Sequence, residues 1–199
     1  MIKIIDINNS KPYKIFTDFY NRALEKDEKH IEAVNISSLN KSENEVDSRY
    51  VNLKYIKDDE WIFFSNYNSP KAVQFLSHDQ ICATFFWKSI YAQVRIMARI
   101  EKTPSDFSDH HFMQRDDKKN ALAISSNQSN ITNSYKEVEK NYSEILEKKD
   151  LLLKRPHYWG GFSFTPYYFE FWEGHNSRLN RREAFKLIGD NWDEFYLEP

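Results

Sequence analysis

The chain has 199 residues, 40% of them hydrophobic and 16% aromatic, a composition that suits a folded globule and excludes a disordered tail. Its 28 basic and 30 acidic residues give a formal net charge of −2, so no chain-wide field recruits nucleic acid or an anionic membrane. Any site for an anion must therefore be local. Cys82 is the only cysteine, which excludes an internal disulfide and suits a reducing compartment.

Hydropathy and the first residues indicate the location. No run of about 18 apolar residues occurs, so no membrane span is expected. The opening stretch, MIKIIDINNSKPYKIF, lacks the long apolar centre of a signal peptide. We therefore expect a cytoplasmic protein whose residues 1–199 form a single domain.

The first half of the chain alternates between helical and strand-like periodicity. A helix is expected over 12–28, and a second over 69–79, where Ser69 is a favourable N-cap and Pro70 suits the first helical position. The inward face of this second helix is expected to carry its apolar residues, Ala72, Val73, Phe75 and Leu76. Strands are expected over 31–39, 48–57, 61–66, 81–87 and 91–102. The last alternates most clearly, with one apolar face formed by Ala92, Val94, Ile96, Ala98 and Ile100.

The second half begins with a mostly helical region, 105–149. Ser134 and Glu137 form a capping box at the start of one of its helices, after a polar loop over 125–133. Two or three further strands close the chain, bringing the total to about seven strands and four or five helices. Because the strands cluster as hairpins, the pattern favours an antiparallel barrel or sheet with helices outside it over a doubly wound fold.

The chain has only four glycines, and none belongs to a GxGxxG or Walker motif. A bound phosphate would therefore be held by side chains or by a helix N-terminus. Lys71 falls in the first turn of the helix expected over 69–79, where a cation opposes the helix dipole by about 0.3–1 kcal/mol. A solvated lysine and a lysine facing a bound anion both explain this position.

Other polar residues give weaker signals when each is taken alone. Arg49 and Lys54 are five positions apart, so simple alternation places them on opposite faces of a strand. Gln93 and the Gln128–Ser129 pair have the character of surface residues. The adjacent His110 and His111 have no further ligands at metal-binding spacing, and no metal site is expected.

Several short motifs keep a common order and spacing over about 130 residues. They are RYVNLK (49–54), FFSNYNSPK (63–71), QVRI (93–96) with Glu101 five positions further on, NQSN (127–130), WGGF (159–162) and FEFWEGHNSRLNRR (169–182). With these motifs the chain resembles the pyridoxamine/pyridoxine 5′-phosphate oxidase family of FMN-dependent flavoproteins, from about Pro12 to Pro199. The resemblance implies a mainly β, α+β fold: an antiparallel split β-barrel with flanking helices.

The resemblance also implies a homodimer with FMN at its interface. Ten positions match the family's FMN contacts: Arg49, Lys54, Phe64, Ser65, Lys71, Gln93, Gln128, Ser129, Trp172 and Arg182. Their chemistry suits FMN, because cations near the start of a helix can gather a phosphate while amides and an indole face the flavin ring. Pro70 replaces an arginine that is usual in the family, so one cation near the implied phosphate is lost. Whether this change lowers the affinity for FMN stays open. Arg181 replaces a usual acidic or amide residue and is expected to be exposed.

The departures from the family pattern concentrate at the implied substrate positions. Where the family holds the substrate phosphate with a Tyr, an Arg and a Ser, this chain has His111, Arg115 and Lys119. Lysine still supplies charge where serine supplied a hydroxyl. Lys54 and Arg178 complete the implied substrate-binding set.

Arg178 and Asn180 are the implied catalytic residues. Asn180 replaces a histidine of the family, and an amide can orient a ligand but cannot shuttle a proton. The implied activity is hydride transfer from the substrate to flavin N5, with reoxidation by O2 to give H2O2. Three functions remain open: oxidation of pyridoxamine or pyridoxine 5′-phosphate, oxidation of another aromatic substrate as in phenazine biosynthesis, and FMN binding without turnover.

Overall fold

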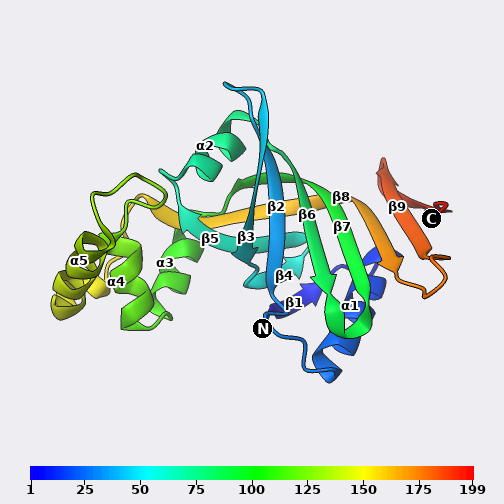
Figure 1. The fold of residues 1–199 in the computed structure, drawn as a ribbon, viewed down its shortest axis with the longest axis horizontal. Helices are drawn as coiled ribbons and strands as arrows, with labels where there is room; N and C mark the ends of the chain where they lie inside the picture. The colour runs from blue at the N-terminus through cyan, green and yellow to red at the C-terminus, as the bar shows by residue number, and fades with distance from the viewer.

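The computed structural model describes residues 1–199, a single sheet flanked by helices at its ends and across one face (Figure 1). The strands are β1 (Lys3–Ile7), β2 (Ala33–Asn40), β3 (Glu45–Asn52), β4 (Tyr55–Asp58), β5 (Glu60–Asn66), β6 (Gln80–Trp87), β7 (Ala92–Lys102), β8 (Trp159–Glu173), β9 (Arg181–Ile188) and β10 (Asn191–Tyr196). The helices are α1 (Lys11–Glu25), α2 (Pro70–Ser77), α3 (Ser105–Met113), α4 (Asp117–Ser125), α5 (Tyr135–Glu147) and α6 (Lys149–Leu152), with a 3-10 turn at Lys88–Ile90.

The strands follow the order β1-β4-β5-β8-β7-β6-β2-β3, and β9 and β10 extend the sheet from β8. Every neighbouring pair is antiparallel except β1 and β4. This arrangement, with helices outside an antiparallel sheet, confirms the predicted fold class. The parallel strand β1 was not predicted, because its five residues are too short to show a clear period.

The 15-residue strand β8 divides the sheet. It pairs with β7 along one edge, while its other edge pairs first with β5, through Trp159–Phe164, and then with β9, through Tyr168–Glu173. Between the two partners lies Pro166, which has no N–H for a ladder bond, and the β7–β8 register shifts there. The WGGF and FEFW motifs consequently lie at opposite ends of one strand.

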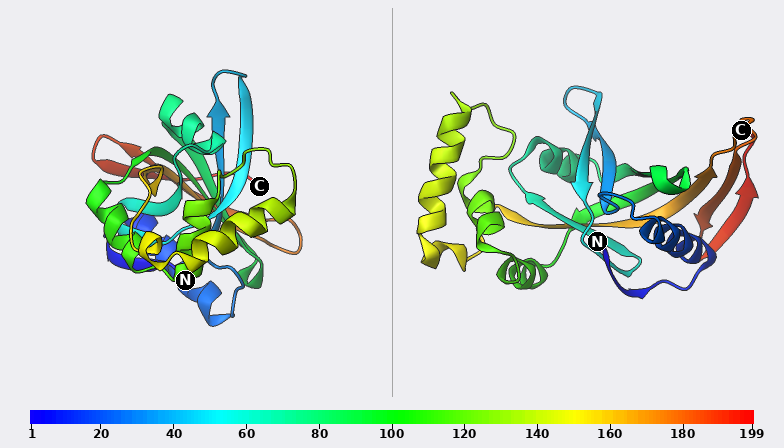
Figure 2. Two further views of the ribbon diagram at one scale, coloured as in Figure 1. Left: turned by 90° about the vertical axis from the view of Figure 1, so that its left-hand side faces the viewer. Right: turned by 60° about the horizontal axis from the view of Figure 1, so that its bottom comes forward.

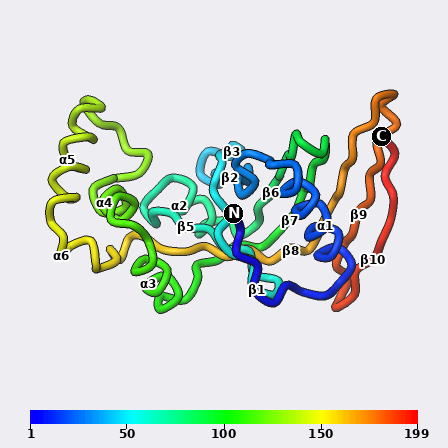
Figure 3. Tube along the Cα trace, turned by 90° about the horizontal axis from the view of Figure 1, so that it is seen from below, coloured from blue at the N-terminus to red at the C-terminus, as the bar shows by residue number.

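Aromatic side chains fill the core between the sheet and α1, which crosses one face of it near β8 to β10 (Figure 3). The Phe16 ring packs edge-on to Trp61 at 4.4 Å, and Tyr13 packs on Phe169 at 5.1 Å. A separate small cluster of Phe112, Ala123 and Trp159 lies under α3 and α4. Burial of these rings holds both ends of β8 in place.

Three local expectations are revised by the structure. The strand expected over 48–57 breaks after Asn52, so Lys54 lies between β3 and β4 and does not alternate with Arg49. On α2, Val73 and Leu76 are each 58% exposed and not inward-facing, while Gln74 is buried at 5% exposure. A buried amide needs hydrogen-bond partners, and Gln74 has them on β2 and β3.

Ser134 is the N-cap of α5 as predicted, since its Oγ accepts from the Glu137 N–H at 3.3 Å. The Glu137 carboxylate does not complete the capping box, because it accepts from the side chains of Thr132 and Asn133 and not from the Ser134 N–H. No residue of this helix is buried, however, because α5 packs against α4 at the outer end of the molecule and not on the sheet (Figure 1).

The two glycines of the WGGF motif are required by close neighbours. A Cβ on Gly160 would lie 2.1 Å from Tyr67 Oη, and one on Gly161 would lie 2.5 Å from Thr103 Oγ1. The Tyr67 ring is packed edge-on against Phe162, and its hydroxyl donates to the Gly161 carbonyl at 3.2 Å. Gly160 and Gly161 therefore allow β8 to pass closely under these side chains.

Replacing Gly160 with alanine is expected to destabilise the fold by about 1–3 kcal/mol, because Tyr67 must leave its packed position. For a chain of this size the melting temperature should fall by roughly 2–12 °C in a thermal unfolding scan. Gly189→Asn is the control, since Gly189 has a positive φ that Asn tolerates and no atom within 4 Å of its Cβ position. An unchanged melting temperature for Gly160→Ala would contradict this account.

Candidate functional site

A cavity of about 490 Å³ opens between the β3–β5 end of the sheet and helices α3 and α4. Five of its lining side chains are cationic and none is acidic. The full lining is Arg49, Tyr50, Val51, Asn52, Lys54, Phe64, Ser65, Lys71, His111, Arg115, Lys119, Gln128, Ser129 and Trp159. Seven of the ten predicted FMN contacts and all the predicted substrate residues except Arg178 thus meet in one cavity. Its charge suits an anion.

Arg49 is held in place by polar groups behind it. Its guanidinium donates to Ser38 Oγ at 2.6 Å and to Gln74 Oε1 at 2.9 Å, and it forms an ion pair with Asp47. Ser38 and Gln74 are buried, and the Ser38 hydroxyl also donates to Gln74 Oε1. The arginine therefore has a fixed orientation before any ligand binds.

Lys71 lies in the first turn of α2, as predicted. Burial first, and then the nearby Arg49 guanidinium, lower the pKa of its ammonium group below the ordinary value of 10.5. Ser69 occupies the N-cap position, but its hydroxyl donates to the Asn66 carbonyl and caps no helix N–H. Two adjacent cations beside a helix N-terminus are unfavourable alone and become favourable when they share an anion.

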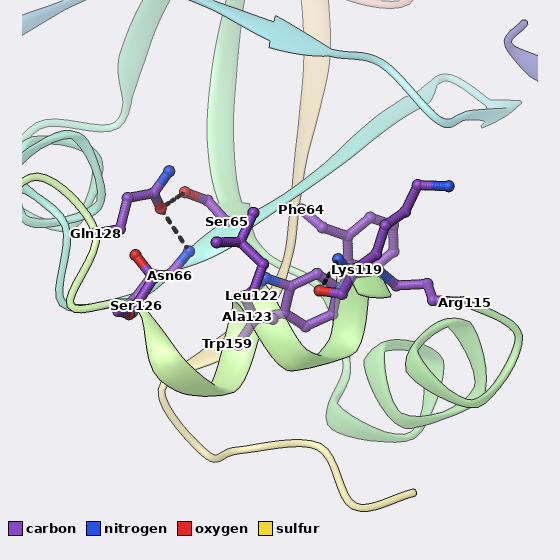
Figure 4. Close-up of a pocket in the computed structure, with 10 residues that line it drawn as sticks. All are labelled: Phe64, Ser65, Asn66, Arg115, Lys119, Leu122, Ala123, Ser126, Gln128 and Trp159. Carbon is purple, nitrogen blue, oxygen red and sulfur yellow. Dashed lines mark hydrogen bonds between the residues drawn. The ribbon is translucent and has the colours of Figure 1, made fainter. Parts of the chain in front are cut away.

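Gln128 and Ser65 meet at the same end of the cavity. Gln128 Oε1 accepts from the Ser65 hydroxyl and from the Asn66 N–H, each at 3.1 Å (Figure 4). These contacts fix the loop after α4, in which Ser129 adopts a positive φ of 70°. That conformation is uncommon for a residue with a side chain and is found where a loop is tightly held.

Arg115 and Lys119 lie beside Phe64 at the other end of the cavity, with Trp159 between them and the Ser65–Gln128 end (Figure 4). The Arg115 guanidinium lies 4.2 Å from the Trp159 ring centroid and donates through Nη2 to the Lys119 carbonyl at 2.9 Å. Its Nη1 is buried without a hydrogen-bond partner, and burial lowers the pKa of Arg115 to about 10. A buried guanidinium nitrogen without a partner indicates a place for an acceptor.

His111 completes this end of the cavity from α3. Its ring stacks on Phe64 at a centroid distance of 3.7 Å, and its Nδ1 lies 2.8 Å from the Tyr55 hydroxyl. Burial first, and then the charges of Arg115 and Lys54, lower the pKa of His111 to about 4. The imidazole is therefore neutral near pH 7.

This shift predicts a pH dependence of stability. The unfolded chain takes up a proton on His111 at its ordinary pKa of 6.5, and the folded chain does so only near pH 4. The free energy of unfolding should therefore fall by up to about 3 kcal/mol, from this residue alone, as the pH drops through that window. Urea unfolding across pH 4–7 should show a smaller acid loss in His111→Asn. His110→Asn, at the exposed neighbouring position, should lose stability as the wild type does.

The other three predicted FMN contacts form a row across three strands. Gln93 on β7 pairs with Trp172 on β8, and Trp172 pairs with Arg182 on β9. Directly paired residues of an antiparallel sheet point to the same face, so the three side chains share one surface. Phe86, the partner of Gln93 on β6, continues this row and is 52% exposed.

Arg182 is oriented by a buried carboxylate. Its Nη2 lies 2.7 Å from Glu170 Oε1, its Nη1 donates to the Glu198 carbonyl at 2.8 Å, and Arg95 also pairs with Glu170. Glu170 is only 3% exposed, and its hydrogen bonds to the two arginines hold its pKa below the ordinary value against the opposing effect of burial.

The predicted catalytic residues Arg178 and Asn180 lie in the exposed turn between β8 and β9. Asn180 Oδ1 accepts from the His175 N–H at 3.0 Å and so closes the turn. Arg178 has a positive φ of 63°. Neither residue lines the cavity, and Arg181 is exposed as expected.

The two groups of residues lie at opposite ends of β8. The right-hand view of Figure 2 shows that α3 to α5 lie at one end of this strand, and β9 and β10 at the other. Trp159 lines the cavity, and Trp172 belongs to the row on β7 to β9. A strand rises about 3.3 Å per residue, so these residues are on the order of 40 Å apart along β8. No mononucleotide is that long, and one chain therefore does not bring all ten predicted contacts to one ligand.

Sequence reasoning missed three residues of the site. Trp159 belongs to the WGGF motif, but only the fold shows that its ring lines the cavity. Gln74 has the appearance of a surface residue on α2, and Tyr55 of an ordinary strand residue. Their partners, Arg49 and His111, are 25 and 56 positions away, so no local pattern reveals these contacts.

No helix of the structure is long and apolar enough to cross a membrane, and no group of three or more potential metal ligands lies together.

Fold and site together define an α+β protein with a strongly cationic, aromatic-lined cavity at one end of an antiparallel sheet. The chain is 32% identical over 191 residues to pyridoxine/pyridoxamine 5′-phosphate oxidase 1 of Hydrogenovibrio crunogenus, covering 94% of this chain and 88% of the relative. It is 32% identical over 190 residues to the corresponding oxidase of Leptospira biflexa, covering 94% and 89%. The chain belongs to the pyridoxine/pyridoxamine 5′-phosphate oxidase family.

Residues 159–199, which form β8 to β10, match the pyridoxine 5′-phosphate oxidase C-terminal dimerisation region. This match indicates a dimer. Among solved structures, PhzG of Burkholderia lata, in complex with tetrahydrophenazine-1-carboxylic acid, has a TM-score of 0.89 at 21% identity, covering 96% of this chain and 93% of PhzG. A pyridoxamine 5′-phosphate oxidase-related, FMN-binding protein of Nostoc punctiforme has a TM-score of 0.76 at 10% identity, covering 96% and 99%. Both confirm the fold.

Proposed function

We propose that this protein is a cytoplasmic, FMN-dependent oxidase of pyridoxamine or pyridoxine 5′-phosphate, and that its active site forms between two copies of the chain. The observation that carries the proposal is the cavity itself, whose five cations face no lining carboxylate. The lone free Cys82 is consistent with a reducing compartment.

The residues present fit FMN. Arg49 and Lys71 at the start of α2 would hold its phosphate, Ser65, Gln128 and Ser129 would supply neutral hydrogen bonds, and Phe64 would offer an aromatic surface. Burial first, and then the charge of Arg49, lower the pKa of Lys71, and a shared dianion would offset both effects, which supports this assignment.

The row of Gln93, Trp172 and Arg182 would complete the same site from a second subunit. The row lies on β7 to β9, and two of its strands belong to the dimerisation region. The exposed Phe86 beside it gives this face an apolar surface that a partner would cover. Each flavin would then contact both chains, as a homodimer requires.

In this arrangement the chain positions the substrate and excludes water. Arg115, Lys119 and His111 would bind the substrate's anionic group, and Lys54, which lines the same cavity, would contact both ligands. Arg178 would orient the substrate from the partner's β8–β9 turn, which Asn180 holds closed. FMN, held by these residues, would supply the hydride acceptor for the oxidation, with O2 as the final electron acceptor and H2O2 as its product.

Oxidation of a different aromatic substrate is the second candidate. A groove of about 370 Å³ between α4 and α5 adjoins the cavity through Lys119, and its apolar lining consists of Leu122, Tyr135, Val138 and Tyr142. This groove would accommodate a ring system larger than a pyridine. The similarity of the fold to PhzG is consistent with this alternative.

One measurement tests the proposal. Purified protein should show a flavin spectrum, and anaerobic addition of pyridoxamine 5′-phosphate should bleach it, with H2O2 formed when air is admitted. A yellow protein that only a larger aromatic substrate bleaches would favour the second candidate. A yellow protein that no such compound bleaches would be an FMN-binding protein without turnover, and a colourless protein that binds no added FMN would overturn the proposal.

A further inference from the structure

A tyrosine and a histidine from distant parts of the chain form a rigid pair in the cavity wall. Tyr55 opens β4, and its hydroxyl lies 2.8 Å from Nδ1 of His111 on α3. The His111 ring is nearly parallel to Phe64, with an interplanar angle of 9°, and Tyr55 packs edge-on to both rings at 5.4 and 6.2 Å. The imidazole is therefore fixed in both position and rotation.

The hydrogen bond between Tyr55 and His111 favours one tautomer of the imidazole. Nδ1 can either accept from the Tyr55 hydroxyl or donate to it. Because this hydroxyl has no other protein partner, donation to Nδ1 is the arrangement that bonds its proton within the protein, and the imidazole proton then lies on Nε2. Nε2 has no protein partner and is not among the buried unpaired atoms. Since His111 lines the cavity, Nε2–H is open to a ligand there.

We propose that Tyr55 is a positioning residue that holds His111 as a neutral hydrogen-bond donor, through Nε2–H, to the anionic group of the ligand that Arg115 and Lys119 also face. The identification of that ligand as the oxidase substrate rests on the proposed function. The donor arrangement itself rests only on the geometry of Tyr55, His111 and Phe64.

The surroundings keep His111 neutral. A second proton on the ring would leave the Tyr55 hydroxyl without an acceptor and would add a cation to those already present. After burial, the charges of Arg115, Lys54 and His110 disfavour a proton on the imidazole, Lys119 lines the same cavity, and the Lys3 ammonium lies 5.9 Å from the Tyr55 ring centroid. No carboxylate opposes them among the lining residues, in keeping with a pKa of about 4.

A neutral donor has a consequence for binding that an ordinary histidine does not have. An imidazole with a pKa near 6.5 would become charged below neutrality and would strengthen the binding of an anion. With Tyr55 in place, the His111 contribution should stay constant between pH 7.5 and 5.5. Tyr55→Phe removes the hydroxyl that donates to His111 Nδ1. The pKa of His111 should then rise by about one unit, because the free energy of one hydrogen bond to the neutral imidazole corresponds to about that change in pKa.

The experiment observes His111 directly. In long-range proton–nitrogen spectra of the ¹⁵N-histidine-labelled protein, wild-type His111 should carry its proton on Nε2 and should not titrate above pH 5. Sulfate, which stays dianionic throughout, should shift the His111 Nε2–H signal with the same dissociation constant at pH 7.5 and 5.5. In Tyr55→Phe the imidazole should show both tautomers, titrate at higher pH and bind sulfate severalfold more tightly at pH 5.5 than at pH 7.5.

Tyr50→Phe is the matched control, because it removes an exposed phenol hydroxyl from the same cavity and should leave the His111 signals unchanged. The inference would be overturned if wild-type His111 titrates near pH 6.5 or carries its proton on Nδ1, or if its signals are the same in Tyr55→Phe. The wild-type titration alone decides if the variant does not fold. The flavin spectrum of the same preparation separates this outcome from a failure of the proposed function.

Discussion

Arg49→Ala is expected to lower the affinity for FMN by about 10- to 100-fold, because one charge-assisted contact to a phosphate is worth about 1.5–3 kcal/mol. The effect should be large because Ser38 and Gln74 already hold this guanidinium in place, so little ordering is required on binding. Fluorescence titration of apoprotein with FMN measures the loss. Riboflavin, which lacks the phosphate, should bind the variant and the wild type almost equally.

Two further variants separate charge and geometry from general damage. Arg49→Lys keeps the charge but loses the two-pronged contact to Gln74 and Ser38, and should have an intermediate affinity. Arg99→Ala removes an exposed arginine that pairs with Asp79 on the outside of β7, and should bind FMN normally. Equal losses of riboflavin and FMN affinity in Arg49→Ala would show that Arg49 does not contact the phosphate.

Mixed dimers of Arg49→Ala and Arg182→Gln chains are expected to recover one functional FMN site per dimer. In such a dimer, one site combines both altered residues, while the other combines the intact Arg49 of one chain with the intact Arg182 of the other. Each variant alone should bind FMN weakly at both sites. Arg182→Gln is chosen because the amide can still donate to Glu170 Oε1, while Arg95 and the Tyr168 hydroxyl bond to the other carboxylate oxygen.

Differently tagged chains allow the mixed dimers to be isolated and their flavin content and oxidase activity to be measured. About half of the wild-type content per dimer is the expected result, with melting temperatures verifying that both variants fold. No recovery in the mixed dimers would mean that Arg49 and Arg182 serve a site within one chain or serve no common site. The distance along β8 argues against the first of these.

Local sequence determined the elements that have a strong period or a terminal signal. The alternation over 91–102 became β7 with its five apolar residues buried, and Ser134 with Glu137 became the start of α5. The placement of Lys71 in the first turn of α2 was also predictable, because Ser69 and Pro70 mark a helix start. The scarcity of glycine predicted that side chains, and not a glycine-rich loop, would hold a phosphate, and cationic side chains do line the cavity.

The residues of the candidate site were predictable only where this sequence keeps the short motifs of the family. Residues of the RYVNLK and FFSNYNSPK motifs do line one cavity, although alternation alone would have separated Arg49 from Lys54. The break after Asn52, which turns the chain between β3 and β4, brings them together. Periodicity cannot report such a break, because it depends on where Leu53 is buried in the tertiary structure.

By itself, the sequence determined the class of fold, and it predicted a local cationic site with most of the residue types that line the cavity, since these follow from hydrophobic period, charge balance and short motifs. Only the tertiary structure decided that the predicted FMN contacts fall into two groups at opposite ends of β8, that Gln74 supports Arg49, and that Tyr55 holds His111. The physical reason is range: these contacts join residues far apart in the chain, and their geometry is set by how strands and helices pack together, which no local pattern encodes.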